Sequence, residues 1–508
     1  MNILLDRFPL ETFLELKSKL DTNGHNVPLC VLTHQSKNLI HQVDSTYFFD
    51  RDIAIGLVTC NVPHMLNRTD IKKASKYEGI AISLFSRFSI DQKYFSAQEM
   101  SSHYYELYNF WTYQIIKYKI QFCFQHYIPH DPSSFVLYIV LKNNKIPVVF
   151  VDVPHIFNKY RPLACSFENR DLLLNCNKNS LCIDFTEESL NYQIQLKQGG
   201  INSIPKTIKF RYEKNKTLIL NNLFKMMFLG FRKPEKIVNY ILNIIKFRKS
   251  AGHFFKISRC AWSNSRSEFS HIQFYFFMKK IAFRLYFERK RYEEKCISSI
   301  PGKYIYFAMS AQPEGTTLPT ALEFRDIFIV LRILREVIPF DVPILFKENP
   351  SVFEMRNPYL SAVGYRSPDF YRRLLEIPNL KLVSSSVNSH DLIKNSLMVA
   401  TINGTAAVES VYFGVPAVTF GSNWYDKING IHKYQSISGL TEFYSKVDRG
   451  LLAARPIDSK LMIDKEMIVQ FEDHNAYEFQ GDARRHLIEA LIASIAKFSR
   501  LDDRKWSF

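Results

Sequence analysis

One short stretch of the sequence combines residue types that bind a nucleotide phosphate. It runs from Thr401 through Ile402, Asn403 and Gly404 to Thr405, and its pattern predicts a strand, a tight turn and a helix. Asn403 and Gly404 allow the turn to approach a ligand closely, and Thr405 offers a hydroxyl and a helix N-terminal amide. Because the helix dipole favours an anion there, we expect a phosphate site.

Glu409 extends this predicted site toward the ribose. It lies four residues after Thr405, one helical turn further along the same face. Its carboxylate can accept hydrogen bonds from both ribose hydroxyls. The alternative is an ordinary helix start, in which Thr405 caps the helix and Glu409 interacts with its dipole.

A second group follows a predicted strand and reads Lys347-Glu348-Asn349-Pro350. Ligands of open α/β sheets bind at the carboxyl ends of the strands, which is where this group falls. Lys347 would neutralise a donor phosphate or carboxylate, and Asn349 would donate a hydrogen bond. We include Glu348 in the predicted nucleotide site, with an ordinary strand-to-loop exit as the alternative.

A third group follows the predicted strand that begins at Lys303. In it, Gln312, Glu314 and Thr316 are expected at the same edge of the sheet. Gln312 is predicted to contact the nucleotide. Glu314 would hold an acceptor hydroxyl or act as a general base, unless it is a solvated loop residue.

The elements that must position these groups alternate between strand-like and helix-like patterns, which predicts parallel sheets. The first half holds a strand at the N-terminus and a helix from Phe135 that ends at Asn143-Asn144. Its other predicted strands are Asn26–Leu32, Ile80–Phe85, Lys119–His126 and Pro147–Val151. The second half adds strands at Val342–Phe346, Leu380–Val383, Met398–Thr401 and Pro416–Phe420 and helices at Ala321–Val337, Pro368–Glu376, Ser389–Asn395, Thr405–Phe413 and Asp482–Phe498.

Composition favours a globular enzyme of more than one domain. The chain has 508 residues, of which 46% are hydrophobic and 23% charged. No apolar run is long enough to span a membrane, and the first residues do not have the order of a secretory signal. The eight cysteines form no CxxC pair, so neither a zinc site nor a disulfide framework is predicted. We expect a cytoplasmic protein.

The net charge of +17 predicts an anionic partner. Basic residues outnumber acidic ones by roughly three to one between Lys209 and Lys295, interleaved with aromatic residues. This stretch is interpreted as a helical linker between domains, or as a peripheral contact with an anionic membrane through residues 209–295. No nucleic-acid-binding signature occurs, so nucleic acid is not an expected partner.

The ordered set of motifs resembles the bacterial capsule and lipopolysaccharide polysaccharide-biosynthesis glycosyltransferases related to retaining β-Kdo transferases. The likeness spans most of residues 304–432. It rests on Gln312-Pro313-Glu314, Lys347-Glu348-Asn349-Pro350, Ile377–Val383, Thr401–Pro416 and Phe420–Tyr425. In the first half, Ser86-Arg87, the aromatic segment Tyr105–Trp111 and Ile128-Pro129-His130-Asp131 match more loosely.

The resemblance implies a GT-B fold, with two Rossmann-like domains around a central cleft and a basic helical connector. The donor would bind the C-terminal domain and the acceptor the N-terminal one, with no metal or cofactor. The expected divisions are residues 1–200 for the acceptor domain, 201–298 for the connector, 299–480 for the nucleotide-sugar domain and 481–508 for a final helix. Arg87 would contact the acceptor, and Asp131, Glu314 and His130 are the predicted catalytic residues.

The implied function is transfer of a sugar from a CMP- or UDP-linked donor to a polysaccharide or glycolipid acceptor. CMP-Kdo is one candidate donor, although Asn349 stands where the family carries histidine, which leaves the donor open. Two alternatives remain: a sugar-nucleotide epimerase of the same fold, and a catalytically degenerate scaffold in polysaccharide assembly.

Overall fold

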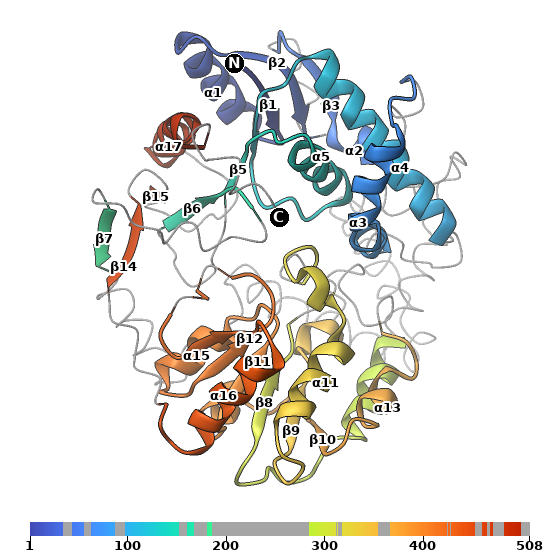
Figure 1. Cartoon of the computed structure of the whole chain (residues 1–508), viewed down its shortest axis with the longest axis vertical. Coiled ribbons are helices and arrows are strands. Elements are labelled where there is room, and N and C mark those ends of the chain that lie inside the picture. The colour runs from blue at the N-terminus through green and yellow to red at the C-terminus, as the bar shows by residue number, and fades with distance from the viewer. Residues whose placement is uncertain are drawn as a thin grey trace, which may run out of the picture.

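The computed structural model describes two α/β units (Figure 1). The ranges it describes are residues 1–33, 43–54, 62–86, 97–151, 160–166, 180–184, 284–310, 312, 317–353, 366–423, 425–426, 428–452, 460–464, 468–470 and 482–498. Arg87, Glu314 and residues 201–283, the greater part of the predicted connector, lie outside these ranges.

The N-terminal unit is built on a mostly parallel sheet of order β15-β6-β5-β4-β1-β2-β3. The five strands from β5 to β3 run parallel, and β6 pairs antiparallel with β5. Their bounds are β1 (Asn2–Asp6), β2 (Asn26–Leu32), β3 (Thr46–Phe49), β4 (Phe122–Gln125), β5 (Val148–Val151) and β6 (Tyr160–Ala164). The strand order reverses between β1 and β4, as in Rossmann-like sheets.

Helices cover this sheet and complete one hydrophobic core. They are α1 (Leu10–Thr22), α2 (Asp50–Ala54), α3 (Arg68–Ser86), α4 (Ala97–Lys117) and α5 (Pro132–Asn143). Asp131 caps α5 by accepting a hydrogen bond from the amide of Ser134, and Pro132 occupies the first turn. The apolar run from Phe135 to Leu141 is buried on every side, which is why its sequence shows little amphipathic pattern.

The predicted strand Ile80–Phe85 is wrong, because these residues form the end of α3. Their apolar run is short enough to suit a strand or a buried helix, and periodicity alone does not separate the two. Helix α3 instead contacts α4 and α5.

The C-terminal unit holds a fully parallel sheet of order β10-β9-β8-β11-β12-β13. Its strands are β8 (Ile305–Ala308), β9 (Ile344–Lys347), β10 (Leu380–Val383), β11 (Met398–Thr401), β12 (Ala417–Thr419) and β13 (Ile431–Lys433). The connecting elements are η4 (Leu322–Arg325), α11 (Ile327–Val337), η5 (Pro350–Phe353), α13 (Phe370–Leu374), α14 (Ser389–Lys394), α15 (Ala406–Tyr412) and α16 (Ile437–Asp448).

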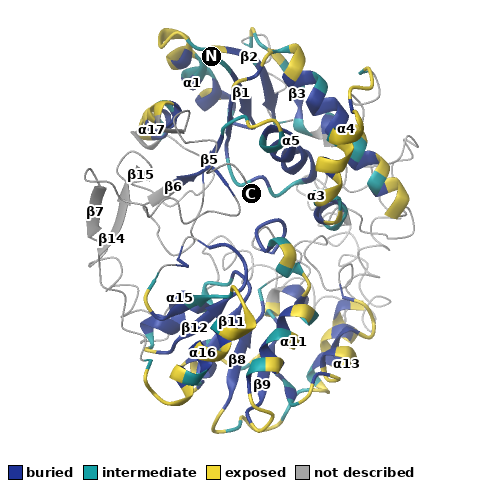
Figure 2. Cartoon of the chain, viewed as in Figure 1, coloured by how far each residue is buried: buried dark blue, intermediate teal, exposed yellow. Residues whose placement is uncertain are grey.

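Alternation along β8 shows that both faces of this sheet are covered. Ile305 and Phe307 belong to the core shared with α11 and α16, whereas Tyr306 and Ala308 belong to the core shared with α14 and α15. The result is a three-layer, doubly wound unit whose buried residues concentrate on the strands (Figure 2). The predicted class, α/β with two Rossmann-like sheets of GT-B type, is confirmed.

Residues 284–297, assigned to the connector in the sequence, pack on the C-terminal sheet. A helix over residues 284–293 buries Leu285 and Tyr292 in its core. The Tyr292 hydroxyl donates to the carbonyl of Val383 at 2.5 Å, and the backbone of Cys296 forms a parallel β-bridge with Leu382 of β10.

The end of the chain returns to the N-terminal unit. The strands β14 (Lys460–Asp464) and β15 (Ile468–Gln470) pair antiparallel with β7 (Ser180–Asp184) and β6. The predicted final helix is confirmed as α17 (Asp482–Phe498), which lies beside α1 (Figure 1). Arg484 of α17 forms an ion pair with Glu11 at 2.5 Å. The expected domain limits stay predictions.

The two units also meet through the segment that follows β8. Leu318 is fully buried within the N-terminal core, and Leu322 packs against the same cluster. Arg325 lies against Gly79 of α3, where an added Cβ would sit 3.0 Å from its Nη2 atom. No helix in the described residues is long and apolar enough to cross a membrane.

Candidate functional site at the β8 and β11 edge

The strand order of the C-terminal sheet reverses between β8 and β11, and such a switch point is where ligands bind in open α/β sheets. The segment after β8 begins with Met309 and Ser310. The turn after β11 carries Asn403, Gly404 and Thr405. The predicted phosphate turn therefore lies at the edge that its sequence pattern implied.

Gly404 is required by the close packing of this turn. A Cβ atom on it would lie 2.6 Å from Thr401 Oγ1 and 3.2 Å from Ser310 Oγ. Its amide donates to Thr401 Oγ1 at 3.1 Å, and its carbonyl accepts from the Tyr425 hydroxyl at 2.7 Å. The glycine thus brings the turn close to Ser310, which the sequence did not single out.

Two polar atoms at this edge are buried without a partner. Within the described ranges, neither Ser310 Oγ nor Asn403 Oδ1 makes a hydrogen bond. The Asn403 amide Nδ2 donates to Thr320 Oγ1 at 2.8 Å. Burying an unsatisfied polar atom is costly, so natural structures rarely keep one without a ligand or water to satisfy it. Both atoms keep the capacity to form a hydrogen bond with a ligand at this edge.

Thr405 and Glu409 contact each other directly. Thr405 Oγ1 donates to Glu409 Oε1 at 2.9 Å, and Glu409 Oε2 lies 3.4 Å from His390 Nε2. Glu409 is only 2% exposed. A ribose would have to exchange for one of these contacts, so the ribose role of Glu409 stays a prediction. Helix α15 has seven residues, and Thr405 makes no side-chain cap.

Lys347 ends β9 directly beside β8, where it pairs in register with Ala308. Its side chain is buried, and Nζ donates to Ser389 Oγ at 2.7 Å. Burial lowers the pKa of Lys347 to about 8, although the charge of Glu293 opposes this change. An ammonium with three donors and a hydroxyl partner retains capacity for an anionic ligand.

Gln312 and Glu348 have protein partners. The Arg366 guanidinium donates to Glu348 Oε2 at 3.1 Å and to Gln312 Oε1 at 2.8 Å. The Tyr371 hydroxyl donates to Glu348 Oε2 at 3.0 Å. Glu348 is fully buried and Gln312 is 1% exposed. The network joins the end of β9 to the segment after β8, and nucleotide contacts by these two residues stay predictions.

The structure gives fewer contacts for the remaining predicted residues of the site. Asn349 is half-buried, and its backbone carbonyl accepts from the amide of Val352 in η5. Glu314 and Arg87 lie outside the described residues, so their roles stay predictions. No cluster of three or more metal-binding side chains occurs in the described ranges.

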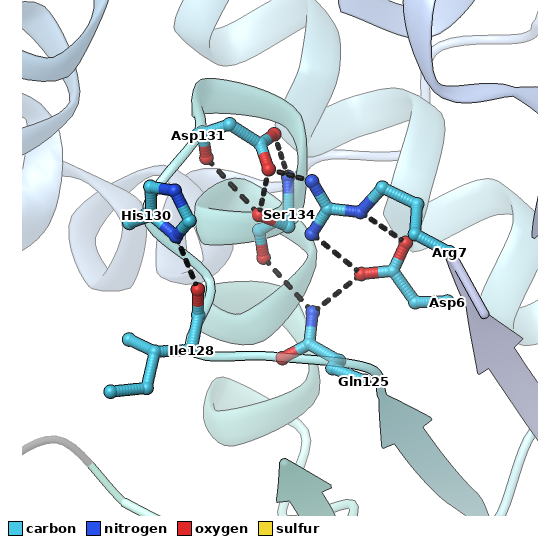
Figure 3. A network of polar contacts seen from close by, with 7 residues as sticks. All are labelled: Asp6, Arg7, Gln125, Ile128, His130, Asp131 and Ser134. Carbon is cyan, nitrogen blue, oxygen red and sulfur yellow. Dashed lines mark hydrogen bonds and ion pairs between the residues drawn. The ribbon is translucent and has the colours of Figure 1, made fainter. Parts of the chain in front are cut away.

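Two of the predicted catalytic residues, His130 and Asp131, lie at the edge of the N-terminal sheet (Figure 3). Asp131 forms an ion pair with Arg7 and accepts from the Ser134 hydroxyl at 2.7 Å. His130 Nδ1 lies 2.8 Å from the carbonyl oxygen of Ile128. Burial opposes the charge of Arg7, but its interactions with Asp6 and other groups hold the pKa above the ordinary value. Asp131 is thus held in place by the protein.

Sequence reasoning missed several members of both sites. Ser389 and His390 sit at the start of α14, where Asn388 caps the helix. The available signal was Asn388 followed by a polar first turn, five residues after the end of a buried strand. The sequence signal for Arg7 was the charged pair Asp6-Arg7 at the end of the first strand.

No protein-family model matches the chain, and no curated protein is similar to it. Among solved structures, a UDP-GlcNAc 2-epimerase from Methanocaldococcus jannaschii shares 11% identity over 90% of this chain and 95% of its own, with a TM-score of 0.25. The β-Kdo 2,7 transferase KpsC from Thermosulfurimonas dismutans shares 16% identity over 31% of this chain and 47% of its own, with a TM-score of 0.21.

A third similar structure is the UDP-GlcNAc 2-epimerase from Neisseria meningitidis bound to UDP-GlcNAc. It shares 9% identity over 88% of this chain and 92% of its own, with a TM-score of 0.20. At such identities and TM-scores these likenesses do not decide a reaction or a ligand. The fold class rests on the strand order of the two sheets.

Proposed function

We propose that the chain is an enzyme acting on a nucleotide sugar, which it binds at the β8 and β11 edge of the C-terminal unit. The observation that carries this proposal is the pair of buried, unsatisfied atoms Ser310 Oγ and Asn403 Oδ1 beside Gly404. Nucleotides supply both phosphate acceptors and hydroxyl or N–H donors, so one ligand can satisfy both atoms.

In this proposal the cationic group of the site is Lys347. Lys347 ends β9 in register with Ala308 of β8. Because Ser310 follows Ala308 by two residues, Lys347 and Ser310 lie at the same edge of the sheet. The Ser310 hydroxyl donates to a phosphate oxygen, and Lys347 offsets the negative charge that grows on the leaving phosphate. Thr405 and Glu409 bind the ribose by exchanging part of their mutual contact.

We propose glycosyl transfer as the reaction, on the strength of the five motifs that occur in the order of the glycosyltransferase resemblance. The bond from the anomeric carbon to the phosphate oxygen breaks, and the nucleotide leaves with the electron pair. An acceptor oxygen forms the new bond and loses its proton to a base. His130, Asp131 and Glu314 are the candidate groups on the acceptor side.

Epimerisation of a nucleotide sugar is the second candidate. One observation favours it: Asp131, an acceptor-side carboxylate of the transfer proposal, is already engaged by Arg7 and Ser134. An epimerase would use the same nucleotide edge but would need no acceptor. A scaffold without catalysis would bind no nucleotide.

One experiment distinguishes transfer from epimerisation. The protein is incubated with UDP-GlcNAc and, separately, with CMP-Kdo, with and without short oligosaccharide acceptors, and followed by proton and phosphorus NMR. Transfer predicts free nucleotide that increases with acceptor, whereas epimerisation predicts a new sugar stereoisomer still attached to nucleotide without acceptor. Binding unchanged after substituting both Thr405→Ala and Glu409→Ala would overturn the assignment of these two residues.

A further inference from the structure

Arg7 has an unusual position at the switch point of the N-terminal sheet. It follows β1 directly and adopts a φ of 62°, in the left-handed region that an arginine rarely occupies. Its amide still donates to the carbonyl of Val31 at 2.8 Å, so the backbone is held in this conformation. Such backbone outliers persist only where the surroundings fix them, and they gather at functional sites.

The guanidinium of Arg7 joins two carboxylates from different parts of the unit (Figure 3). Its Nε donates to Asp6 Oδ1 at 3.0 Å and its Nη2 to Asp6 Oδ2 at 3.1 Å. Its Nη1 pairs with Asp131 Oδ2. Because Arg7 is 4% exposed, these contacts are shielded from solvent. Arg7 therefore ties the turn before α5 to the end of β1.

Gln125 makes a second tie at the same place. Its Nε2 donates to Asp6 Oδ2 at 2.9 Å and to the carbonyl of Ser134 at 3.3 Å. Asp131 Oδ1 accepts from the amide of Ser134 at 3.1 Å. The first turn of α5 and the ends of β1 and β4 thus share one buried hydrogen-bonded network, and Asp131 is one of its structural members.

His130 is the neighbouring group that this network can orient. The contact of 2.8 Å between its Nδ1 and the Ile128 carbonyl places the proton on Nδ1 in the neutral ring, because a carbonyl oxygen only accepts. Nε2 then carries the lone pair. The ring of Tyr127 lies 5.2 Å from the His130 ring and 4.8 Å from the Arg7 guanidinium carbon. Arg7 therefore contacts Tyr127 and Asp131, which lie on either side of His130 in the sequence.

We propose that Arg7 is a positioning residue, which holds the Ile128–Asp131 turn so that Nε2 of His130 receives the proton of an acceptor hydroxyl. This inference rests on the proposed transfer reaction. As the acceptor oxygen bonds to the anomeric carbon, its O–H bond breaks and the proton passes to Nε2, while the nucleotide leaves with the electron pair of the broken bond. Asp131 takes no proton and serves to anchor the turn.

The test compares Arg7→Lys, Arg7→Met and His130→Gln with the wild type. Lysine keeps the charge but cannot bridge Asp6 and Asp131 with a planar fork. Arg484→Lys is the matched control, since Arg484 also pairs with two carboxylates, Glu11 and Glu15, but lies on α17. Each protein is checked for an unchanged melting temperature, or is assayed below it.

We expect Arg7→Lys to lower kcat by about 10- to 100-fold, because small misplacements of a reacting group cost rates of this order. Nucleotide affinity should stay within about twofold of wild type, since the nucleotide edge lies in the other unit. A limb of the pH profile should disappear in His130→Gln and remain in Arg7→Lys. Arg7→Met should lose more kcat than Arg7→Lys, and Arg484→Lys none.

A readout independent of turnover completes the test. Nitrogen-15 NMR of histidine-labelled protein, with the His130 signal assigned by its loss in His130→Gln, should show the Nδ1–H tautomer in wild type. Arg7→Lys should give a mixed or shifted signal. A wild-type His130 signal in Arg7→Lys, or an unchanged kcat, overturns the positioning role. If wild type binds no nucleotide, the proposed function fails, while the His130 signal still decides whether Arg7 orients the ring.

Discussion

The side-chain amide of Asn403 donates to Thr320 Oγ1 at 2.8 Å, and this bond links the predicted nucleotide turn to the contact between the two units. Thr320 lies two residues after Leu318, which is buried in the N-terminal core. The carbonyl of Thr320 also accepts from the amide of Ser422, after β12. A ligand that contacts Asn403 therefore binds a residue that is hydrogen-bonded to Thr320, in the segment that joins the two units.

Leu318→Ala should destabilise the protein by about 2–5 kcal/mol, as expected for removing a buried leucine side chain. The loss arises from apolar contact between the units, so it should appear in the unfolding of the N-terminal core. Urea unfolding followed by tryptophan fluorescence measures it, with Trp111 buried in that core. The matched control is Leu451→Ala, because Leu451 is 71% exposed. Equal effects of the two substitutions would show that Leu318 is not packed as described.

Gly421→Ala should abolish nucleotide binding. A Cβ on Gly421 would overlap the side-chain amide of Asn403, which would have to move. Titration calorimetry measures the affinity. Gly302→Ala is the control, since nothing lies within 4 Å of the Cβ position there. Wild-type affinity in a folded Gly421→Ala protein would remove Asn403 from the site.

Glu348→Gln should destabilise the protein by about 3–5 kcal/mol, because Arg366 then keeps a buried charge without its carboxylate. If Glu348 is structural, the nucleotide affinity of the folded variant should stay near that of wild type. Thermal unfolding and calorimetric titration measure the two quantities. Asp369→Asn, which breaks an exposed pair with Arg372, should leave the melting temperature unchanged. A stable Glu348→Gln that has lost affinity would instead support the predicted nucleotide contact.

We expect Lys347 to take up a proton when an anionic nucleotide binds. Its pKa in the folded protein is about 8, so the side chain is largely neutral at pH 9. A phosphate beside it favours the charged form and raises the pKa. Titrations at pH 9 in buffers of different ionisation enthalpy should show uptake approaching about one proton per nucleotide. Lys347→Met should abolish the uptake, and the exposed Lys303→Met should not.

The same group sets a pH dependence of stability. The folded pKa of about 8 lies below the ordinary 10.5, so between these values the unfolded chain holds a proton that the folded chain has lost. Stability therefore rises with pH through this window and does not fall. In Lys347→Met this rise should disappear from urea-unfolding measurements between pH 8 and pH 10.5; an unchanged rise would mean that Lys347 is not buried.

The sequence predicted most of the sheet positions because buried strands and turn residues follow local rules. Strands Asn26–Leu32 and Met398–Thr401 have the predicted bounds, and Gly404 lies in the turn where it was expected. Local rules failed for Ile80–Phe85, where an apolar run suited to a strand continues a helix. Tertiary contacts with α4 and α5 decide that case, and they leave no local signal.

The partners of the site residues were the least predictable feature. Glu348 pairs with Arg366, 18 residues later, and Gln312 joins the same guanidinium from another strand end. A residue type shows that a side chain can bind a ligand, but not whether the fold has already used it. Likewise, the antiparallel pairing of Ile468–Gln470 with the N-terminal sheet depends on the whole topology.

Nucleotide binding is tested most directly by the melting temperature of the full chain with UDP, CMP or GDP and their common sugar conjugates. A ligand at 100 times its Kd stabilises the native state by about 2.7 kcal/mol, which is readily measured. Binding at the β8 and β11 edge should raise the melting temperature with at least one nucleotide, and this rise should be lost in Gly421→Ala and kept in Gly302→Ala. A folded wild-type protein whose melting temperature responds to none of them would contradict the nucleotide site.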